Sequence, residues 1–359
     1  MSNKSWDNIS SATKSVWAGE EENFVEGAAQ VPIVNSVSYS YDDLDEWFDV
    51  ATGKRKGHIY SRNNNPTVTG FEEKMRNLED AEAATSFATG MAAISNILFS
   101  LLSPGQRVVS VKDTYGGTSV VFLDHLPRFN INVTMCETHD QDAIEAEIFR
   151  ECDLLYLETP TNPTMKILDL KRLIAAGKKM GAIIVVDNTF ATPINQNPLT
   201  LGADLVVHSA TKFIGGHSDA LGGVVCGSAD LIQKIYEFRE INGATLDANS
   251  AYLLIRGLKT LDIRIEKQNK NAMALAKFLL NHDKVEEVFY PGLERDICHE
   301  IAKRQMKGFS GMLSFSLKGG FDAVRNFLPQ IRFAHRAAHL GGVETIVGPP
   351  RTTSHVELS

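Results

Sequence analysis

The chain has 359 residues, 43% of them hydrophobic and 22% charged, which is the composition of an ordinary globular protein. Its 36 basic and 44 acidic residues give a formal net charge of −8. This charge argues against a nucleic-acid partner, because no basic field would collect phosphates. The four cysteines are scattered without a CxxC pair, so we expect free thiols in a reducing compartment and no metal site.

The N-terminal stretch 1–17 is polar and lacks the apolar core of a secretory signal. The longest apolar stretches, such as 91–102, are interrupted by polar residues and are too short to cross a bilayer. We therefore expect a soluble, cytoplasmic protein with no membrane partner.

Residues 1–57 are weakly patterned, with an extended piece over 27–34 and a short helix predicted over 42–50. The loop that follows carries Tyr60 and Arg62, and a helix is predicted over 68–78. A phenol beside a planar guanidinium suits a phosphate group, although many loops carry such a pair.

A short strand predicted over 83–88 meets Thr89 and Gly90, and an alanine-rich helix follows to residue 102. Glycine at the start of a helix leaves the first backbone N–H groups open, and anions bind at such helix ends. An ordinary N-cap before a buried helix explains the same pattern equally well.

Strands and helices alternate in the next part of the chain. Strands are predicted over 107–111, 131–136, 153–158, 183–186 and 205–207, and helices over 119–126, 141–149 and 168–180. This alternation predicts an α/β fold with a mostly parallel sheet covered by helices on both faces.

Beyond residue 229 the pattern changes. Helices are predicted over 231–241, 248–280 and 320–330, and strands over 285–290 and 312–317. A smaller α+β domain is therefore expected to begin near residues 255–265.

Polar side chains follow several of the predicted strands directly. In parallel α/β sheets, ligands gather at the carboxyl ends of the strands. Seven polar residues fall at such ends, namely Tyr115, Glu158, Asn162, Asp187, Ser209, Thr211 and Lys212.

Lys212 is the most informative of these residues. A lone lysine after a strand is ordinarily a solvated surface residue. In a partly dry pocket, however, an amine loses its proton more easily and becomes a nucleophile toward carbonyl groups.

Pyridoxal phosphate satisfies the whole constellation. Its aldehyde forms an imine with a lysine, its phosphate binds hydroxyls and backbone N–H groups, and an aspartate such as Asp187 keeps its ring nitrogen protonated. The sequence has no GxxxxGK[ST] and no GxGxxG motif for a nucleotide, and its histidines lack metal-ligand spacing.

Residues 209–217 read SATKFIGGH, and over 25–355 the chain resembles the Cys/Met-metabolism group of fold-type I pyridoxal-phosphate enzymes. This group includes cystathionine γ-synthases, cystathionine and methionine γ-lyases and O-acylhomoserine sulfhydrylases. The resemblance implies Lys212 as the imine lysine and proton shuttle, Asp187 at the pyridine nitrogen and Tyr115 stacked on the ring. It implies a phosphate site formed by Ser209, Thr211 and the backbone of Gly90 and Met91. It places Asn162 near the cofactor 3-oxygen and the substrate carboxylate, and Glu158 and Thr189 as residues that support those in direct contact.

The resemblance also implies assembly. Tyr60 and Arg62 are expected to reach the phosphate of a neighbouring subunit, so we expect an obligate homodimer, commonly paired into a homotetramer. The implied domains are an N-terminal arm over 1–60 that contributes to the neighbouring subunit, a large cofactor-binding domain over 61–258 and a C-terminal domain over 259–359.

The implied reaction acts on γ-substituted amino acids. Lys212 is expected to remove the α-proton, and Tyr115 to assist departure of the γ-group. Replacement by a thiol or sulfide on an O-acylhomoserine, in sulfur amino-acid metabolism, is the favoured outcome. The reason is that Gly117 stands where methionine γ-lyases typically carry cysteine.

Two alternatives remain open at this stage, namely γ-elimination and cofactor binding without turnover. His339 stands where the family has serine, which suggests a shifted substrate pocket, although an imidazole packed beside the site explains it equally well. The family pattern also continues past the position of Ser359 to an arginine that grips the substrate carboxylate. We therefore expect the chain to continue beyond Ser359.

Overall fold

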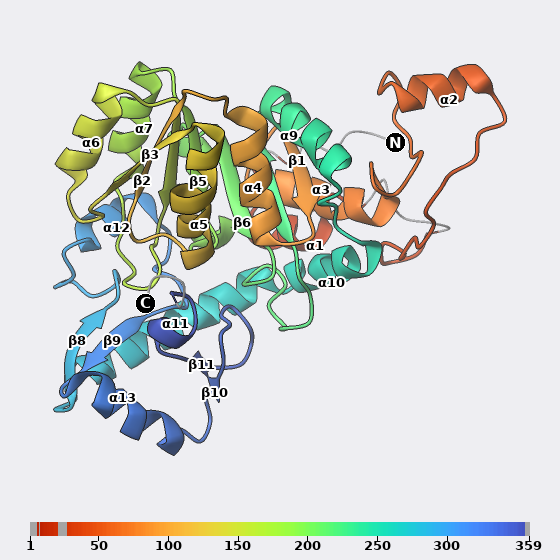
Figure 1. Ribbon diagram of the computed structural model, residues 1–359. Helices are drawn as coiled ribbons and strands as arrows, with labels where there is room; N and C mark the ends of the chain where they lie inside the picture. Colours follow the sequence, from red (N-terminus) through yellow and green to blue (C-terminus); the bar gives the residue numbers. More distant parts are fainter. Residues whose placement is uncertain (1–5, 7, 21–26, 356–359) are drawn as a thin grey trace.

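The computed structural model describes residues 6, 8–20 and 27–355 (Figure 1). Residues 1–5, 7 and 21–26, which belong to the predicted N-terminal arm, and residues 356–359 lie outside the described part. No helix within the described ranges is long and apolar enough to cross a membrane.

A seven-stranded sheet with the order β1-β7-β6-β5-β4-β2-β3 forms the centre of the molecule. β7 runs antiparallel to β1 and β6, and the other neighbouring pairs are parallel. The predicted α/β class is confirmed. The strands are β1 (Ala83–Phe87), β2 (Arg107–Val111), β3 (Asn132–Cys136), β4 (Leu154–Glu158), β5 (Ile183–Asp187), β6 (Leu205–Ser209) and β7 (Gly223–Gly227).

Helices cover both faces of this sheet (Figure 1). Side chains alternate between the faces along each strand, so that Val185 packs in one core and its neighbours Ile184 and Val186 in the other. One face is covered by α4 (Gly90–Leu101), α5 (Gly116–Val120) and α9 (Ala229–Asn242), the other by α3 (Pro66–Leu78), α6 (Gln141–Arg150), α7 (Leu170–Lys179) and α10 (Ala248–Leu258).

The 20-residue helix α11 (Leu261–Leu280) leads into the smaller C-terminal part. There it packs against an antiparallel pair of strands through Ala272, Ala276 and Leu279. The proposed domain division at residue 259 falls between α10 and α11. The elements of this part are β8 (Val285–Phe289), α12 (His299–Gln305), β9 (Ser314–Leu317), α13 (Gly320–Phe327), β10 (His335–Arg336) and β11 (Ile346–Val347).

Several elements differ from the sequence expectations. The helix expected over 119–126 begins earlier, at Gly116, and becomes π-helical over Val121–His125. The helix expected over 248–280 is interrupted at Lys259 and Thr260. The sequence did not predict the strand β7, nor that the weakly patterned N-terminus contains α1 (Ser11–Trp17) in addition to α2 (Leu44–Ala51).

The N-terminal helices lie in different surroundings. α1 packs against α3 and α11 of its own chain, and the buried Glu20 that follows it pairs with the buried Lys74 at 2.8 Å. α2 projects from the body of the molecule (Figure 1). It carries the exposed side chains of Leu44, Trp47 and Phe48.

Candidate active site

Three neighbouring parallel strands end in polar residues at one edge of the sheet. β4 ends at Glu158, β5 at Asp187 and β6 at Ser209. Glu158 is the register partner of Asp187, and Asp187 that of Val207. The structure therefore brings these predicted site residues together, because the apolar strands before them stay in register.

Asp187 is buried and held by three hydrogen bonds. Its Oδ1 accepts from the backbone N–H of Thr189 at 3.0 Å and from the Thr189 hydroxyl at 2.6 Å. Its Oδ2 accepts from the hydroxyl of Tyr156 at 3.1 Å. The carboxylate is fixed in orientation before any ligand arrives.

Burial raises the pKa values of Glu158 and Asp187 above their ordinary range, and the negative charge of Asp187 raises that of Glu158 further. Hydrogen bonds from Thr189 and the charge of His208 oppose the rise at Asp187. A cationic group placed beside Asp187 would relieve this repulsion, so the site suits a protonated ring nitrogen.

One hydroxyl links Asp187 to the end of β6. The Thr189 Oγ1 that donates to Asp187 also accepts a hydrogen bond from the backbone N–H of Ser209 at 2.9 Å. A substitution at Thr189 would therefore disturb both strand ends.

The N-terminus of α4 lies directly against Ser209. A Cβ on Gly90 would lie 2.7 Å from the Ser209 Cβ, so only glycine permits this approach. Thr89 caps the helix by accepting from the N–H of Ala92 at 3.0 Å. The first N–H groups of an α-helix have no partner within the helix, so those of Gly90 and Met91 can bind an anion together with the Ser209 hydroxyl.

Lys212 lies in the turn after β6, where its backbone N–H donates to the Ser209 carbonyl at 3.1 Å. Burial lowers the pKa of its amine below the ordinary lysine value. The Nζ lies 3.5 Å from Nδ1 of His339, which comes from the C-terminal part of the chain. Burial and the charge of Lys212 lower the pKa of His339 in turn.

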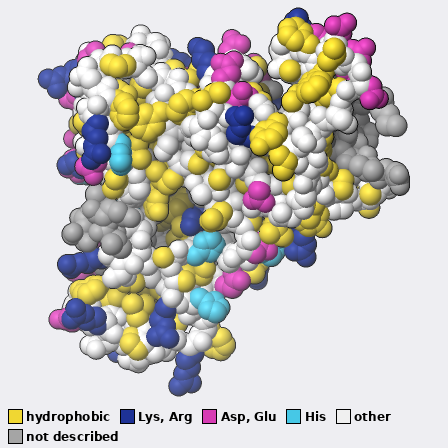
Figure 2. Space-filling view, turned by 45° about the vertical axis from the view of Figure 1, so that its right-hand side comes forward, with side chains coloured by type: hydrophobic (Ala, Val, Ile, Leu, Met, Phe, Trp, Pro, Cys, Tyr) yellow, Lys and Arg dark blue, Asp and Glu magenta, His cyan; other side chains and the backbone are white. Residues whose placement is uncertain are grey.

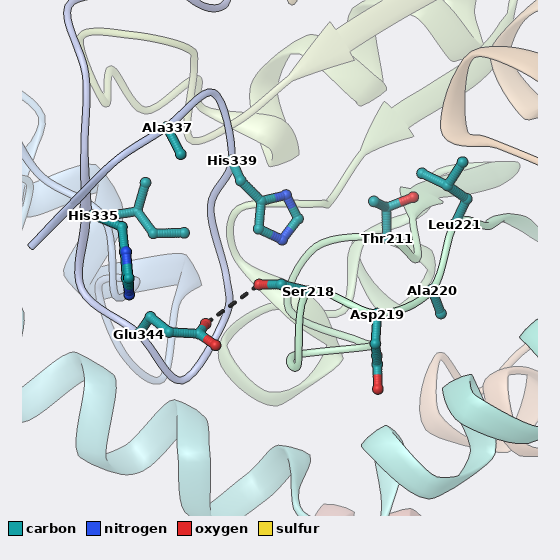
Figure 3. Close-up of a pocket in the computed structure, with 10 residues that line it drawn as sticks. Thr211, Ser218, Asp219, Ala220, Leu221, His335, Ala337, His339 and Glu344 are labelled. Atoms are coloured by element: carbon teal, nitrogen blue, oxygen red, sulfur yellow. Dashed lines mark hydrogen bonds between the residues drawn. The ribbon is translucent and has the colours of Figure 1, made fainter.

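A cavity of about 640 Å³ opens beside this contact. Figure 3 shows His335, His339 and Glu344 on one side, facing Thr211 and the segment 218–221 on the other. Glu344 accepts a hydrogen bond from Ser218 at 3.3 Å across the gap. In the space-filling view, histidine side chains lie beside a hollow near the middle of one face (Figure 2).

Tyr115 and Asn162 lie near Glu158. The Tyr115 backbone N–H donates to the Glu158 carboxylate at 2.8 Å, and its ring is partly exposed. The Asn162 N–H also bonds Glu158, and its Oδ1 accepts from Ser354 at 3.3 Å. Thr211 uses its hydroxyl within the loop, donating to the Gly222 carbonyl at 3.2 Å and accepting from the Gly222 N–H at 3.0 Å.

Tyr60 and Arg62 have different neighbours. Arg62 donates to the Glu240 carbonyl at the end of α9, and its guanidinium lies 5.6 Å from the centre of the Tyr60 ring. Among the described residues, Arg62 contacts α9, whereas the Tyr60 backbone pairs with Ser38 and accepts from the N–H groups of Asn63 and Asn64. None of these contacts is with the strand ends around Lys212.

Sequence reasoning did not identify two buried groups behind Asp187. Tyr156 lies in the middle of an apolar strand, two residues before Glu158. This spacing places both side chains on the same face of the strand, and it was the only sequence signal for Tyr156. The other is His208, whose Nε2 lies 2.6 Å from the carboxylate of Glu79. Nothing in the sequence connects His208 with Glu79, because the two residues are 129 positions apart.

A half-buried lysine after a strand, a buried carboxylate and a helix N-terminus beside a serine fit the aldehyde, ring nitrogen and phosphate of pyridoxal 5′-phosphate. The site and sheet therefore define the chain as a pyridoxal-phosphate enzyme of the α/β fold type I.

Comparison with known proteins gives the family. The family model for the Cys/Met metabolism PLP-dependent enzyme matches residues 12–359, and the chain belongs to this family. An L-methionine gamma-lyase of Fusobacterium nucleatum subsp. polymorphum is 40% identical over 346 residues, 96% of this chain and 87% of the relative. The chloroplastic cystathionine gamma-synthase 1 of Arabidopsis thaliana is 38% identical over 97% of this chain and 62% of its own length.

A solved cystathionine gamma synthase of Xanthomonas oryzae pv. oryzae, in complex with aminoacrylate and cysteine, superposes with a TM-score of 0.90. It is 37% identical, and the match covers 98% of this chain and 89% of that one. The chain is thus a pyridoxal-phosphate-dependent transferase or lyase that acts on γ-substituted amino acids.

Proposed function

We propose that the protein catalyses γ-replacement, joining a thiol or sulfide to the γ-carbon of an O-acylhomoserine. The observation that carries this proposal is the closeness of Gly117 to Tyr115. A Cβ at position 117 would lie 2.8 Å from Cε1 of Tyr115 and 3.2 Å from Sδ of Met91. The phenol ring fills the space in which methionine γ-lyases, by the resemblance above, carry a cysteine.

Pyridoxal phosphate, when bound, supplies an electron sink that acidifies the α-carbon of an attached amino acid. In the proposed roles, Lys212 holds the aldehyde, Asp187 the ring nitrogen and Ser209 the phosphate. Asn162 and His339 are proposed to contact the substrate. The roles of Lys212, Asp187 and Ser209 rest on their positions at one sheet edge, and that of His339 on its contact with Lys212.

Lys212 is also proposed to move the α-proton. A free amine accepts a proton only in its neutral form, and burial lowers the pKa of Lys212 so that more of it is neutral near pH 7. The phenol of Tyr115 is proposed to donate a proton to the departing γ-group, since its ring is accessible beside Glu158.

The second candidate is γ-elimination, in which the same γ-group leaves and water releases a 2-oxo acid and ammonia. Its support is the name of the relatives, since an L-methionine gamma-lyase is among the most similar proteins. Family membership supports turnover over cofactor binding alone.

A substrate panel tests the proposal. The purified protein is incubated with O-acetylhomoserine or O-succinylhomoserine, with and without cysteine or sulfide, and the products are separated by mass spectrometry. Replacement predicts cystathionine or homocysteine only when the thiol is present. A 2-oxobutyrate yield that is unchanged by thiol would instead establish elimination.

Lys212→Ala serves as the control. It should abolish every product and also the absorption band near about 420 nm that marks cofactor bound to lysine. A wild-type protein that keeps the band but converts none of these substrates would contradict both candidate functions.

A further inference from the structure

Arg264, in the first turn of α11, is a buried cation. Its guanidinium donates four hydrogen bonds to neutral oxygens, and it takes part in none of the ion pairs found among the described residues. Burying an unpaired guanidinium costs free energy of folding. Its role therefore depends on which groups its hydrogen bonds hold in place. Consistent with burial, the pKa of Arg264 falls to about 10.

Two of the four partners of Arg264 belong to the segment that directly follows Lys212. Its Nη1 donates to the carbonyl of Phe213 at 2.8 Å, and its Nη2 to that of Ile214 at 3.4 Å. The same Nη2 donates to the Gly257 carbonyl at the end of α10 at 2.8 Å, and Nε to Thr260 Oγ1 at 3.0 Å. One planar group thus joins the lysine loop to the junction of α10 and α11.

Backbone contacts around this guanidinium are unusually close. A Cβ on Gly216, whose φ is +71°, would lie 2.2 Å from Nη1 of Arg264. A Cβ on Gly257 would lie 2.2 Å from the Gly215 carbonyl oxygen. On the side of Lys212, a Cβ on Gly341 would lie 2.5 Å from the Phe213 backbone nitrogen. The loop is therefore enclosed by α10, α11 and the segment that carries His339.

We propose that Arg264 is a positioning residue for Lys212. It fixes the two carbonyl groups after the lysine, and so holds the amine in its half-buried position just after β6. The forked guanidinium can satisfy both the loop and α10 from one plane, whereas a lysine ammonium is a point donor without this fixed geometry. The inference does not depend on whether the reaction is replacement or elimination.

The physical consequence concerns the reactivity of Lys212. If the loop relaxes, the amine becomes more accessible to water and its pKa rises toward the ordinary lysine value. Less of it is then neutral at a given pH, and its reaction with an aldehyde slows.

The test uses the full chain, freed of cofactor and then mixed with pyridoxal phosphate. Growth of the band near about 420 nm gives the rate at which Lys212 reacts, measured from pH 6 to about 10. We expect Arg264→Met to slow this rate about tenfold or more and to shift its pH midpoint upward, with Arg264→Lys recovering part of the loss.

Arg107 provides the matched control. It also donates to helix carbonyls, with Nη1 3.0 Å from the Glu147 carbonyl oxygen, but lies at the opposite end of the sheet in β2. Arg107→Met should lower thermal stability without moving the pH midpoint. Equal rates and midpoints for the Arg264→Met and Arg107→Met proteins would overturn the proposal.

Two further measurements keep the proposal testable if Arg264→Met does not fold. Gly257→Ala pushes on the same loop without removing a charge, and it should shift the pH midpoint in the same direction. Amide hydrogen exchange of residues 213–216 in the cofactor-free Arg264→Lys protein should also be faster than in wild type. Wild-type values in both variants would overturn the proposal as well.

Discussion

Gly117 makes a contact at the scale of single residues that can be tested directly. Adding one methyl group at this position would place an atom 2.8 Å from the Tyr115 ring. Gly117→Ala should therefore displace the phenol and lower kcat/KM by roughly 10–100-fold, since misplacing a catalytic group by about 1 Å has an effect of this size. Steady-state kinetics with the best substrate of the panel measure the loss.

A double-mutant cycle with Tyr115→Phe and Tyr115→Ala is the control for this prediction. If the methyl group acts through the ring, Gly117→Ala should cost little in a Tyr115→Ala background, where the ring is absent. A full, additive loss in that background would show that the methyl group acts elsewhere.

The sequence predicted where the chemistry-bearing residues lie because each follows an apolar strand. Asp187 and Ser209 end β5 and β6, and Lys212 follows three residues later. The contact between Lys212 and His339 joins positions 127 residues apart, and the hydrogen bonds of Arg264 join α11 to a loop 51 residues earlier. Tertiary contacts of this kind leave no periodic pattern, so the position of His339 was indicated only by the resemblance, and the contacts of Arg264 were not predicted.

At the scale of elements, a buried ion pair fixes the N-terminal helix. Lys74 in α3 pairs with Glu20 and also donates to the carbonyls of Ser15 and Val16, at 3.1 and 2.9 Å. Burial lowers the pKa of Lys74 from 10.5 to about 8, even though Glu20 opposes the shift.

This shift predicts a pH-dependent stability with a definite sign. Between pH 8 and 10.5 the unfolded chain holds a proton on Lys74 that the folded chain has lost. The contribution of Lys74 to stability therefore rises with pH in this window, and it stays level at its lowest value below about pH 8, where both states carry the proton. Urea denaturation should show the stability of wild type relative to Lys74→Met rising by about 2–3 kcal/mol from pH 7.5 to about 10.

Lys259→Met is the matched control, because Lys259 pairs with the other oxygen of Glu20 at 2.9 Å. If both variants showed the same pH dependence relative to wild type, the shift would not belong to Lys74.

The elements that the sequence did not reveal share a physical cause. α1 is short and its stability comes from packing on α3 and α11, which a weakly patterned sequence does not show. β7 reads GVVCG, with glycines at both ends, and follows a long turn with no helix before it. The alternation of helices and strands predicted β2 to β6, but no helix separates β6 from β7, so this pattern did not predict β7.

At the scale of the whole molecule, Tyr60 and Arg62 carry the proposal of an active site shared between subunits. Arg62 donates to the Glu240 carbonyl of α9, and α2, which projects from the body of the molecule, exposes Leu44, Trp47 and Phe48. Hydrophobic side chains gather on the lobe at the upper right of Figure 2. Because exposed apolar stripes often mark interaction surfaces, we propose that a second copy of this chain covers this stripe.

Subunit mixing tests the shared site. Arg62→Ala and Lys212→Ala should each be nearly inactive alone. If Arg62 acts on the neighbouring subunit, a mixed dimer has one site with both changes and one intact site, so an equal mixture should regain roughly a quarter of wild-type activity. Co-expression with two affinity tags gives the mixed species, and activity no higher than that of the separate variants would contradict sharing.

The position of β7 in the sheet has a consequence for how the chain folds during synthesis. In the seven-stranded sheet β1 lies at the edge beside β7, and Phe87 at its end waits for Gly223, its partner 136 residues later. At roughly 5–20 residues per second, β1 has no neighbouring strand for about 7–27 s on the ribosome. The backbone edge of β1 that later pairs with β7 stays unpaired for that time, so we expect chaperones to be needed most before β7 leaves the exit tunnel.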